Sequence, residues 1–71
     1  MVYQRIRNLR EDRDLKQREI ADYLNCSQRV YSNYELGQRD IPTDVLIRLS
    51  HYYDVSVDYL LGLTANPKRN K

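Results

Sequence analysis

Residues Gln17 to Gly37 read QREIADYLNCSQRVYSNYELG and contain two short amphipathic segments around a tight turn. Apolar residues recur three and four positions apart in the first segment, which predicts a helix whose buried stripe is Ile20, Ala21 and Leu24. Asn25 tolerates a left-handed backbone and is expected to end that helix. Ser27 can cap a second helix by accepting a backbone N–H, and Gly37 supplies the positive φ that ends it.

The second segment has one apolar face and one polar face. Tyr31 and Tyr34, with Val30 in part, are expected to be buried, so the side chains left pointing outward are Gln28, Arg29, Ser32 and Asn33. Two helices joined by so short a turn cross steeply, and a small side chain at Ala21 lets their backbones meet. The alternative is that Ala21 is simply a good helix former. The whole pattern is typical of a helix-turn-helix, whose second helix can enter the major groove of DNA.

Length and charge limit what the rest of the chain can be. The 71 residues suffice for one domain with a modest core, and Cys26, the only cysteine, excludes a disulfide within the chain. No signal peptide or long apolar run is present, so we expect a cytoplasmic protein with no membrane contact. The net charge is +2 over residues 1–39, −3 over 40–66 and +3 over 67–71. The N-terminal part is therefore the better surface for a polyanion, although ordinary solvated surface is the alternative.

Helical spacing continues before this motif. Residues 2–12 are predicted to form a first helix, whose apolar stripe is Val2, Ile6 and Leu9. Arg10 and Arg13 continue that stripe, so each must reach solvent or find a partner, and Glu35 is a candidate partner for Arg10. Lys16 is a poor N-cap for the following helix, at a cost of about 1 kcal/mol relative to Ser or Thr.

Two more helices are predicted after the motif. Pro42 fits the start of a fourth helix, whose apolar face is Val45, Leu46, Leu49, Tyr52 and Tyr53. Asp54 turns the chain, and Ser56 caps a short fifth helix. No strand pattern appears, so the predicted fold is an all-α, compact five-helix domain over residues 1–63. Residues 64–71 carry three positive charges and are predicted to form a basic flexible tail.

Over residues 3–62 the chain resembles the Cro/phage-repressor-like (XRE) family of bacterial and phage regulators. The motifs that carry the resemblance are IRNLRE, LKQREIADYL, SQRVYSNYELG, RDIP, VLIRLSHYYDVS and VDYLLG. Lys16 stands where the family usually has Thr or Ser, and Asn25 where it usually has Gly, and neither change moves the expected helices. The resemblance implies a lambda-repressor-like domain that binds double-stranded DNA sequence-specifically and regulates transcription. The favoured function is that of a repressor, which acts by occupying an operator.

Helix geometry leaves four side chains of the second helix on its outward side, and the resemblance implies that these same positions read bases. They are Gln28, Arg29, Ser32 and Asn33. Arg29 can form two hydrogen bonds with guanine O6 and N7, and Gln28 or Asn33 can do the same with adenine N6 and N7. Ser32 discriminates weakly between bases. The alternative is that these side chains are only the polar surface of a core helix.

Contacts with the DNA backbone are assigned to three other residues. The resemblance gives Gln17 a phosphate, where the amides at a helix N-terminus would help. Gln38 and Arg39 follow the second helix and are candidates for another phosphate, with a solvated loop as the alternative. Arg10 and Glu35 resemble the family's internal ion pair, which would hold the first helix against the base-reading helix.

Other chemistry finds little support. Cys26 lies beside a helix N-terminus, which favours a thiolate and a redox-sensing role, but the family usually has an aliphatic residue there and free cysteine packs as a small hydrophobe. His51 has no His or Cys at ligand spacing, so no metal site is predicted. No nucleophile, base and acid occur as a set, so we expect neither an enzyme nor a cofactor or small-molecule ligand.

One helix-turn-helix reads few base pairs, so a homodimer on a palindromic operator is predicted. The predicted dimer interface surrounds the fifth helix and comprises Val55, Val57, Tyr59, Leu60, Leu61 and Leu63. Val57 and Leu60 could instead belong to the core. Two alternatives for the function stay open. One is the antitoxin of a toxin–antitoxin pair, whose apolar patch would bind the toxin, and the other is a protein-interaction adaptor that does not bind DNA.

Overall fold

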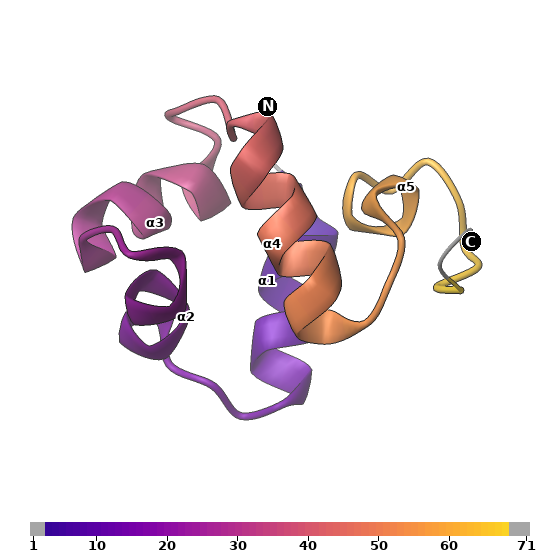
Figure 1. Ribbon diagram of the computed structural model, residues 1–71, viewed down its shortest axis with the longest axis horizontal. Helices are drawn as coiled ribbons and strands as arrows, with labels where there is room; N and C mark the ends of the chain where they lie inside the picture. The colour runs from indigo at the N-terminus through magenta and orange to yellow at the C-terminus, as the bar shows by residue number, and fades with distance from the viewer. Residues whose placement is uncertain (1–2, 69–71) are drawn as a thin grey trace.

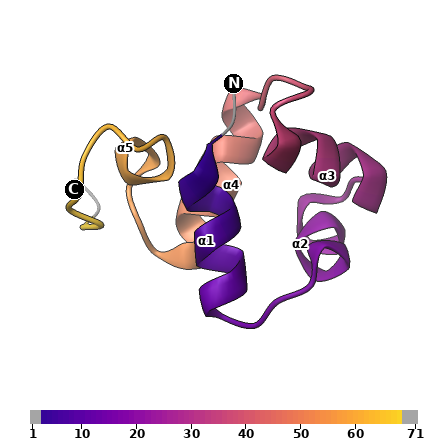
Figure 2. The ribbon, with the colours of Figure 1, turned by 180° about the vertical axis from the view of Figure 1, so that it is seen from behind.

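A computed structural model describes residues 3–68, and five helices make up its regular structure (Figure 1). In chain order the helices are α1 (Gln4–Asp12), α2 (Gln17–Leu24), α3 (Gln28–Leu36), α4 (Thr43–Tyr53) and α5 (Val57–Leu60). Helices α1 and α4 lie at the centre of the molecule, with α2 and α3 on one side and α5 on the other (Figures 1 and 2). No strand occurs within residues 3–68, so the predicted all-α five-helix fold is confirmed.

Local capping chemistry sets the ends of α2 and α3. Lys16 is the N-cap of α2 and forms no side-chain capping bond, whereas Asn25 ends that helix with φ 59°. The hydroxyl of Ser27 accepts the Val30 N–H at 3.1 Å and so satisfies one free amide at the start of α3. Gly37 ends α3 with φ 75°, a conformation in which a Cβ would be strained. These predicted helix boundaries are confirmed.

Of the other three helices, only α1 begins later than predicted. Helix α1 begins at Gln4 with Tyr3 as its N-cap, and Val2 lies outside the described residues. Helix α4 follows Pro42 and ends at Asp54 with φ 54°. The Ser56 hydroxyl accepts the Tyr59 N–H at 3.0 Å and caps α5, as expected.

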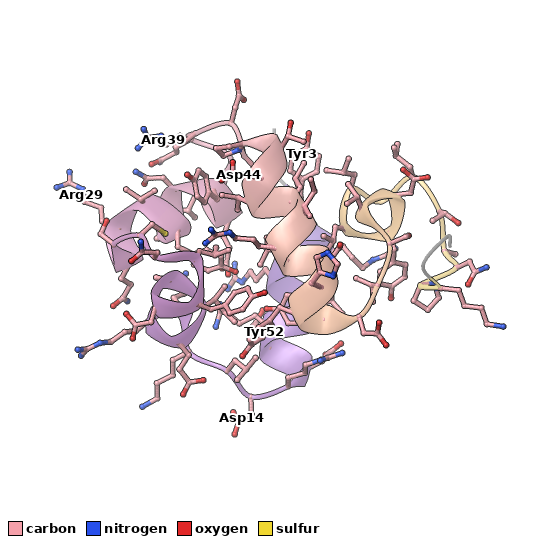
Figure 3. All side chains as sticks on the ribbon, viewed as in Figure 1. Tyr3, Asp14, Arg29, Arg39, Asp44 and Tyr52 are labelled. Atoms are coloured by element: carbon pink, nitrogen blue, oxygen red, sulfur yellow. The ribbon has the colours of Figure 1, made fainter. Side chains whose placement is uncertain are left out.

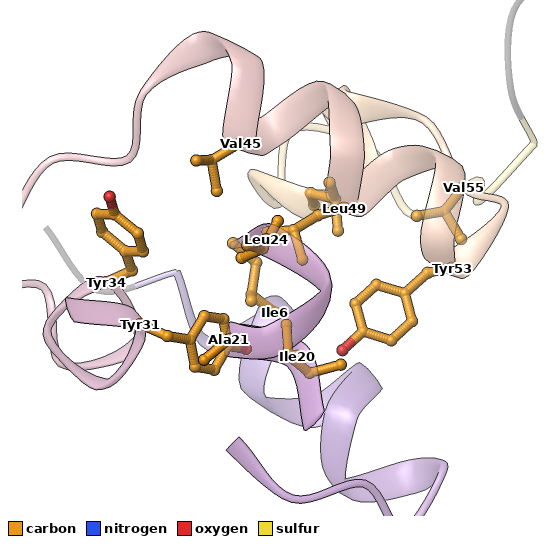
Figure 4. Close-up of a cluster of buried hydrophobic side chains, with 11 residues drawn as sticks. Ile6, Ile20, Ala21, Leu24, Tyr31, Tyr34, Val45, Leu49, Tyr53 and Val55 are labelled. Atoms are coloured by element: carbon orange, nitrogen blue, oxygen red, sulfur yellow. The ribbon is translucent and has the colours of Figure 1, made fainter. Parts of the chain in front are cut away.

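One core joins all five helices (Figure 4). Its buried members are Ile6, Ile20, Ala21, Leu24, Tyr31, Tyr34, Val45, Leu49, Tyr53, Val55 and Leu60. Ala21 is 1% exposed, so any larger side chain there would have to displace the packed neighbours. The two largest fully buried side chains are Tyr31 and Tyr53, which supply aromatic volume in a chain without Phe or Trp. The core therefore holds α2 and α3 in one fixed arrangement.

Two arginines of α1 bind backbone carbonyls on distant elements. Arg13 Nη2 donates to the Tyr53 carbonyl at 3.0 Å. Arg13 therefore binds a carbonyl at the C-terminus of α4, where a positive charge is favourable. Arg5 Nη1 lies 3.4 Å from both the Tyr59 and Thr64 carbonyls, and its guanidinium stacks 4.1 Å from the centre of the Tyr59 ring. These contacts connect α1 to the C-terminal part of the domain.

Residues 64–68, the described part of the predicted basic tail, make contacts near the start of α5. The Ser56 N–H donates to the Pro67 carbonyl at 3.1 Å, and the Asn66 and Lys68 amides are bound by side chains within the same segment. The chain therefore folds back along the start of α5. There the Pro67 carbonyl satisfies the backbone amide of Ser56, the N-cap residue of that helix. Residues 69–71 lie outside the described residues. Among the described helices, none combines the length and apolar character that crossing a bilayer requires.

Candidate nucleic-acid interface

Helices α2 and α3 together form one end of the molecule, and α3 presents a polar face there. Gln28 and Arg29 are exposed in its first turn, and Ser32 and Asn33 are half-buried one turn later. Figure 3 shows the Arg29 side chain extending away from the body of the protein. The opposite face of the helix buries Tyr31, Tyr34 and Glu35. The structure therefore brings the four predicted base-reading residues onto one accessible surface, which we call the α3 polar face.

The loop after α3 places a second exposed cation, Arg39, at the same end of the molecule, followed by the exposed Asp40. Gln38 and Arg39 are both exposed, and Arg39 projects from this loop on the side where Arg29 lies (Figure 3). The one acidic residue within α3, Glu35, is buried and faces inward. The α3 polar face thus carries a cation and neutral hydrogen-bonding groups, a combination suited to base edges that lie between phosphates.

Arg10 and Glu35 form a two-bond ion pair on the inner side of α3. Arg10 Nε donates to Glu35 Oε2 at 2.7 Å and Nη2 donates to Oε1 at 3.2 Å, and the two side chains are 13% and 2% exposed. Arg10 Nη1 also donates to the Leu15 carbonyl at 2.9 Å. The Arg10 guanidinium therefore connects α1 both to α3 and to the loop that precedes α2. The structure brings together the two residues that were predicted to pair.

Gln17 takes part in this buried cluster. Its Nε2 donates to Glu35 Oε1 at 3.2 Å, a contact that the sequence did not reveal because the residues are 18 positions apart. The side-chain amide predicted to bind a phosphate therefore has an internal partner. Its second N–H, and the free backbone amides that every helix has in its first turn, remain the groups through which α2 could bind an anion.

The cluster alters the acidity of Glu35. Burial is the largest single influence and would raise its pKa, but hydrogen bonds led by those from Arg10 outweigh it and leave the pKa below its usual value. Glu35 in turn raises the pKa of Arg10 through the same hydrogen bonds. Burial raises the pKa of Tyr31, whose hydroxyl lies beside this carboxylate. Glu35 is therefore the ionised centre of the cluster at neutral pH.

The two residues considered for redox or metal chemistry have ordinary surroundings. Cys26 is partly buried against the core, and this burial raises the pKa of its thiol, which favours the packing interpretation over a reactive thiolate. His51 is exposed on α4. No group of three or more possible metal ligands occurs within residues 3–68.

The predicted dimer interface requires a correction. Val55 is 5% exposed and Leu60 is 0% exposed, so both belong to the core and present no side chain to a partner. Their burial follows from the turn after α4, which directs α5 back against α1 and α4. Of the other predicted residues, Leu63 is 73% exposed, whereas Val57, Tyr59 and Leu61 are half-buried. The apolar surface near α5 is smaller than predicted.

Comparison with known proteins gives consistent matches across the chain. Residues 6–60 match a family model described as helix-turn-helix. The HTH-type transcriptional regulator ImmR of Bacillus subtilis is 42% identical over 67 residues, which cover 94% of this chain and 53% of ImmR. The transcriptional repressor RstR of a cryptic phage CTXphi in Vibrio cholerae is 31% identical over 62 residues, covering 87% of this chain and 56% of RstR.

A solved structure gives the same result in three dimensions. The crystal structure of a transcriptional regulator from Listeria innocua superposes with a TM-score of 0.77 at 30% identity, and covers 93% of this chain and 64% of that protein. The chain therefore spans between about half and two thirds of the length of these three proteins.

Proposed function

This chain belongs to the helix-turn-helix family, and on that basis we propose that it is a sequence-specific double-stranded DNA-binding regulator of transcription. ImmR and the Listeria innocua protein are named transcriptional regulators, in line with the prediction that the chain is not an enzyme. The proposed activity requires the compartment that holds the DNA, which in bacteria is the cytoplasm.

The α3 polar face is the single observation that carries this proposal. Its most exposed members, Gln28 and Arg29, lie in the first turn of a helix whose position is set by the core and by the Arg10–Glu35 pair. A helix held this way can enter the major groove without rearranging. An adaptor that binds protein partners would have no need for a polar surface with this mixture of amide, hydroxyl and guanidinium groups.

Each residue of the interface has a role matched to its chemistry. Arg29 donates two hydrogen bonds to a guanine, and Gln28 or Asn33 pairs with an adenine, each contact being worth about 1–3 kcal/mol of discrimination. Arg39, with Gln38, holds a phosphate beside the groove. Gln17 and the first amides of α2 hold a phosphate on the other side, with the Gln17 side chain oriented by Glu35.

We also propose that the protein acts as a repressor, in the form of a homodimer on a palindromic operator. RstR is named a repressor, and a protein bound across an operator can exclude the transcription machinery without further chemistry. The half-sites are expected about one helical turn apart. The residues near α5 that keep accessible apolar surface, and so could meet a second copy, are Val57, Tyr59, Leu61 and Leu63.

Selection of double-stranded DNA from a random pool by the purified protein, at about 0.15 M salt, tests the proposal. Enrichment of a palindrome would support a dimeric regulator, and enrichment of a single short site would support sequence-specific binding by one copy. Salt-sensitive binding without enrichment would contradict sequence-specific recognition and would favour the adaptor, or an antitoxin that binds DNA only with its toxin.

A further inference from the structure

One large apolar side chain lies among the polar residues of α3 without contributing to the core. Leu36 is 52% exposed, and it is absent from both the buried cluster and the partly buried residues that pack against it. Exposing a leucine to water gives up the stabilisation that its burial would provide. The fold therefore gives no packing reason for an apolar residue at this position.

Helix geometry places Leu36 near the middle of the α3 polar face. Seven residues span nearly two full turns, so Leu36 lies within about 20° of Arg29 around the helix axis. Ser32 lies one turn before Leu36, about 40° to the other side. The buried residues Tyr31 and Tyr34 point in the opposite direction, toward the core. A surface that receives Arg29 and Ser32 also receives Leu36.

The surroundings of Leu36 favour DNA over a protein as its contact. Arg29 and Arg39 are exposed on the same end of the molecule, and the acidic Glu35 next to Leu36 is buried and paired. The polar side chains that share this face of α3 with Leu36 are positive or neutral, which suits a groove that is lined by phosphates and presents one apolar group. In the major groove that group is the C5-methyl of thymine.

We propose that Leu36 is a specificity-determining residue that contacts the C5-methyl group of a thymine in the operator. This inference rests on the proposed function, because it assumes that α3 lies in the major groove. Leu36 is seven residues beyond Arg29, about 10.5 Å along the helix. In a helix that follows the groove, the thymine lies about three base pairs from the guanine read by Arg29.

Replacing thymine by uracil in the selected operator, one position at a time, tests this proposal because uracil lacks only the methyl group. For the wild-type protein, one such replacement per half-site at the expected distance should weaken binding about fourfold, which corresponds to one buried methyl group. For Leu36→Ala the same replacement should have no effect. Ile47→Ala is the matched control, since Ile47 is an equally large apolar residue, 47% exposed on α4. It should retain the full methyl dependence.

Each outcome decides the matter. Methyl dependence at one position that is lost in Leu36→Ala and kept in Ile47→Ala supports the contact. Two results would overturn the contact while the proposed function stands. One is a methyl dependence that persists unchanged in Leu36→Ala. The other is a Leu36→Ala protein that differs from wild type only in self-association, measured by sedimentation. Failure of the wild-type protein to select any operator would overturn both. Circular dichroism and thermal unfolding establish that both alanine variants keep the wild-type fold.

Discussion

Arg10 of α1 and Glu35 of α3, 25 positions apart, form a two-bond ion pair with Nε 2.7 Å from Oε2 and Nη2 3.2 Å from Oε1. Glu35 also accepts a hydrogen bond from Gln17, and Arg10 donates to the Leu15 carbonyl. Helix α3, which carries the proposed base-reading residues, is thus tied to α1 and α2 by one carboxylate on its inner face. Stability, acid sensitivity and the orientation of the proposed interface consequently depend on the same group.

Glu35→Gln should lower the free energy of unfolding by about 3–5 kcal/mol, because it leaves the largely buried Arg10 charge without a counter-charge. Urea denaturation measures the change. Glu11→Gln is the control, since Glu11 pairs with Arg7 on the surface of α1 and its loss should cost less than about 0.5 kcal/mol. Equal losses of unfolding free energy in the two variants would show that the Arg10–Glu35 pair stabilises the fold no more than a surface ion pair.

Glu35 should also make the protein sensitive to acid. Its folded-state pKa lies below the unfolded value of about 4.3, so its contribution to stability is fully present above that pH and disappears as the pH falls through the folded value. The stability difference between wild type and Glu35→Gln should therefore shrink between pH 5 and pH 3. Urea unfolding of both proteins across this range measures it. A difference that stays constant with pH would rule out Glu35 as the titrating group.

Arg29→Ala should weaken binding to the selected operator by about 1–3 kcal/mol and relax the preference at one base pair. The physical reason is the loss of two hydrogen bonds to a guanine from a side chain that extends freely from α3. Titration of the operator and of variants changed at each position, followed by fluorescence anisotropy, gives both quantities. Unchanged affinity and specificity would remove Arg29 from the base-reading residues.

Arg39→Ala should weaken binding to all DNA sequences by a similar factor. A phosphate contact carries no sequence information, so its loss should also reduce the slope of log affinity against log salt by about 1. Anisotropy titrations of operator and random duplexes over a range of salt concentrations measure both effects. A loss confined to one operator base would instead make Arg39 a base reader.

Lys16→Ser should raise the free energy of unfolding by about 1 kcal/mol. Lys16 has the extended conformation of an N-cap, φ −88° and ψ 152°, close to that of Ser27, but its side chain makes no capping bond. A serine hydroxyl there could accept the Glu19 N–H, and Glu19 three positions later could complete a capping box. Thermal and urea unfolding report the gain. Ser27→Ala, which should lose a similar amount, shows how much such a cap contributes in this protein.

The helices and their ends could be predicted because the signals are local. Apolar spacing of three and four residues marks the buried face of each helix, and Ser27, Asn25 and Gly37 act on backbone groups within a few positions of themselves. The outward positions of α3 follow from the same periodicity, so four predicted base-reading residues lie on one face. These features need no knowledge of how the helices pack.

The sequence alone therefore determined the five helices, their caps and the polar face of α3, while the tertiary structure decided which side chains meet across long separations. The second partner of Glu35, the carbonyl bound by Arg13 and the burial of Val55 and Leu60 all depend on how α1, α4 and α5 pack. Residues of a core and residues of a protein–protein interface show the same apolar periodicity, because both exclude water. The pattern alone therefore does not separate the two. Only the packed arrangement shows that Leu60 is covered by its own chain and that Leu36 is left open to solvent.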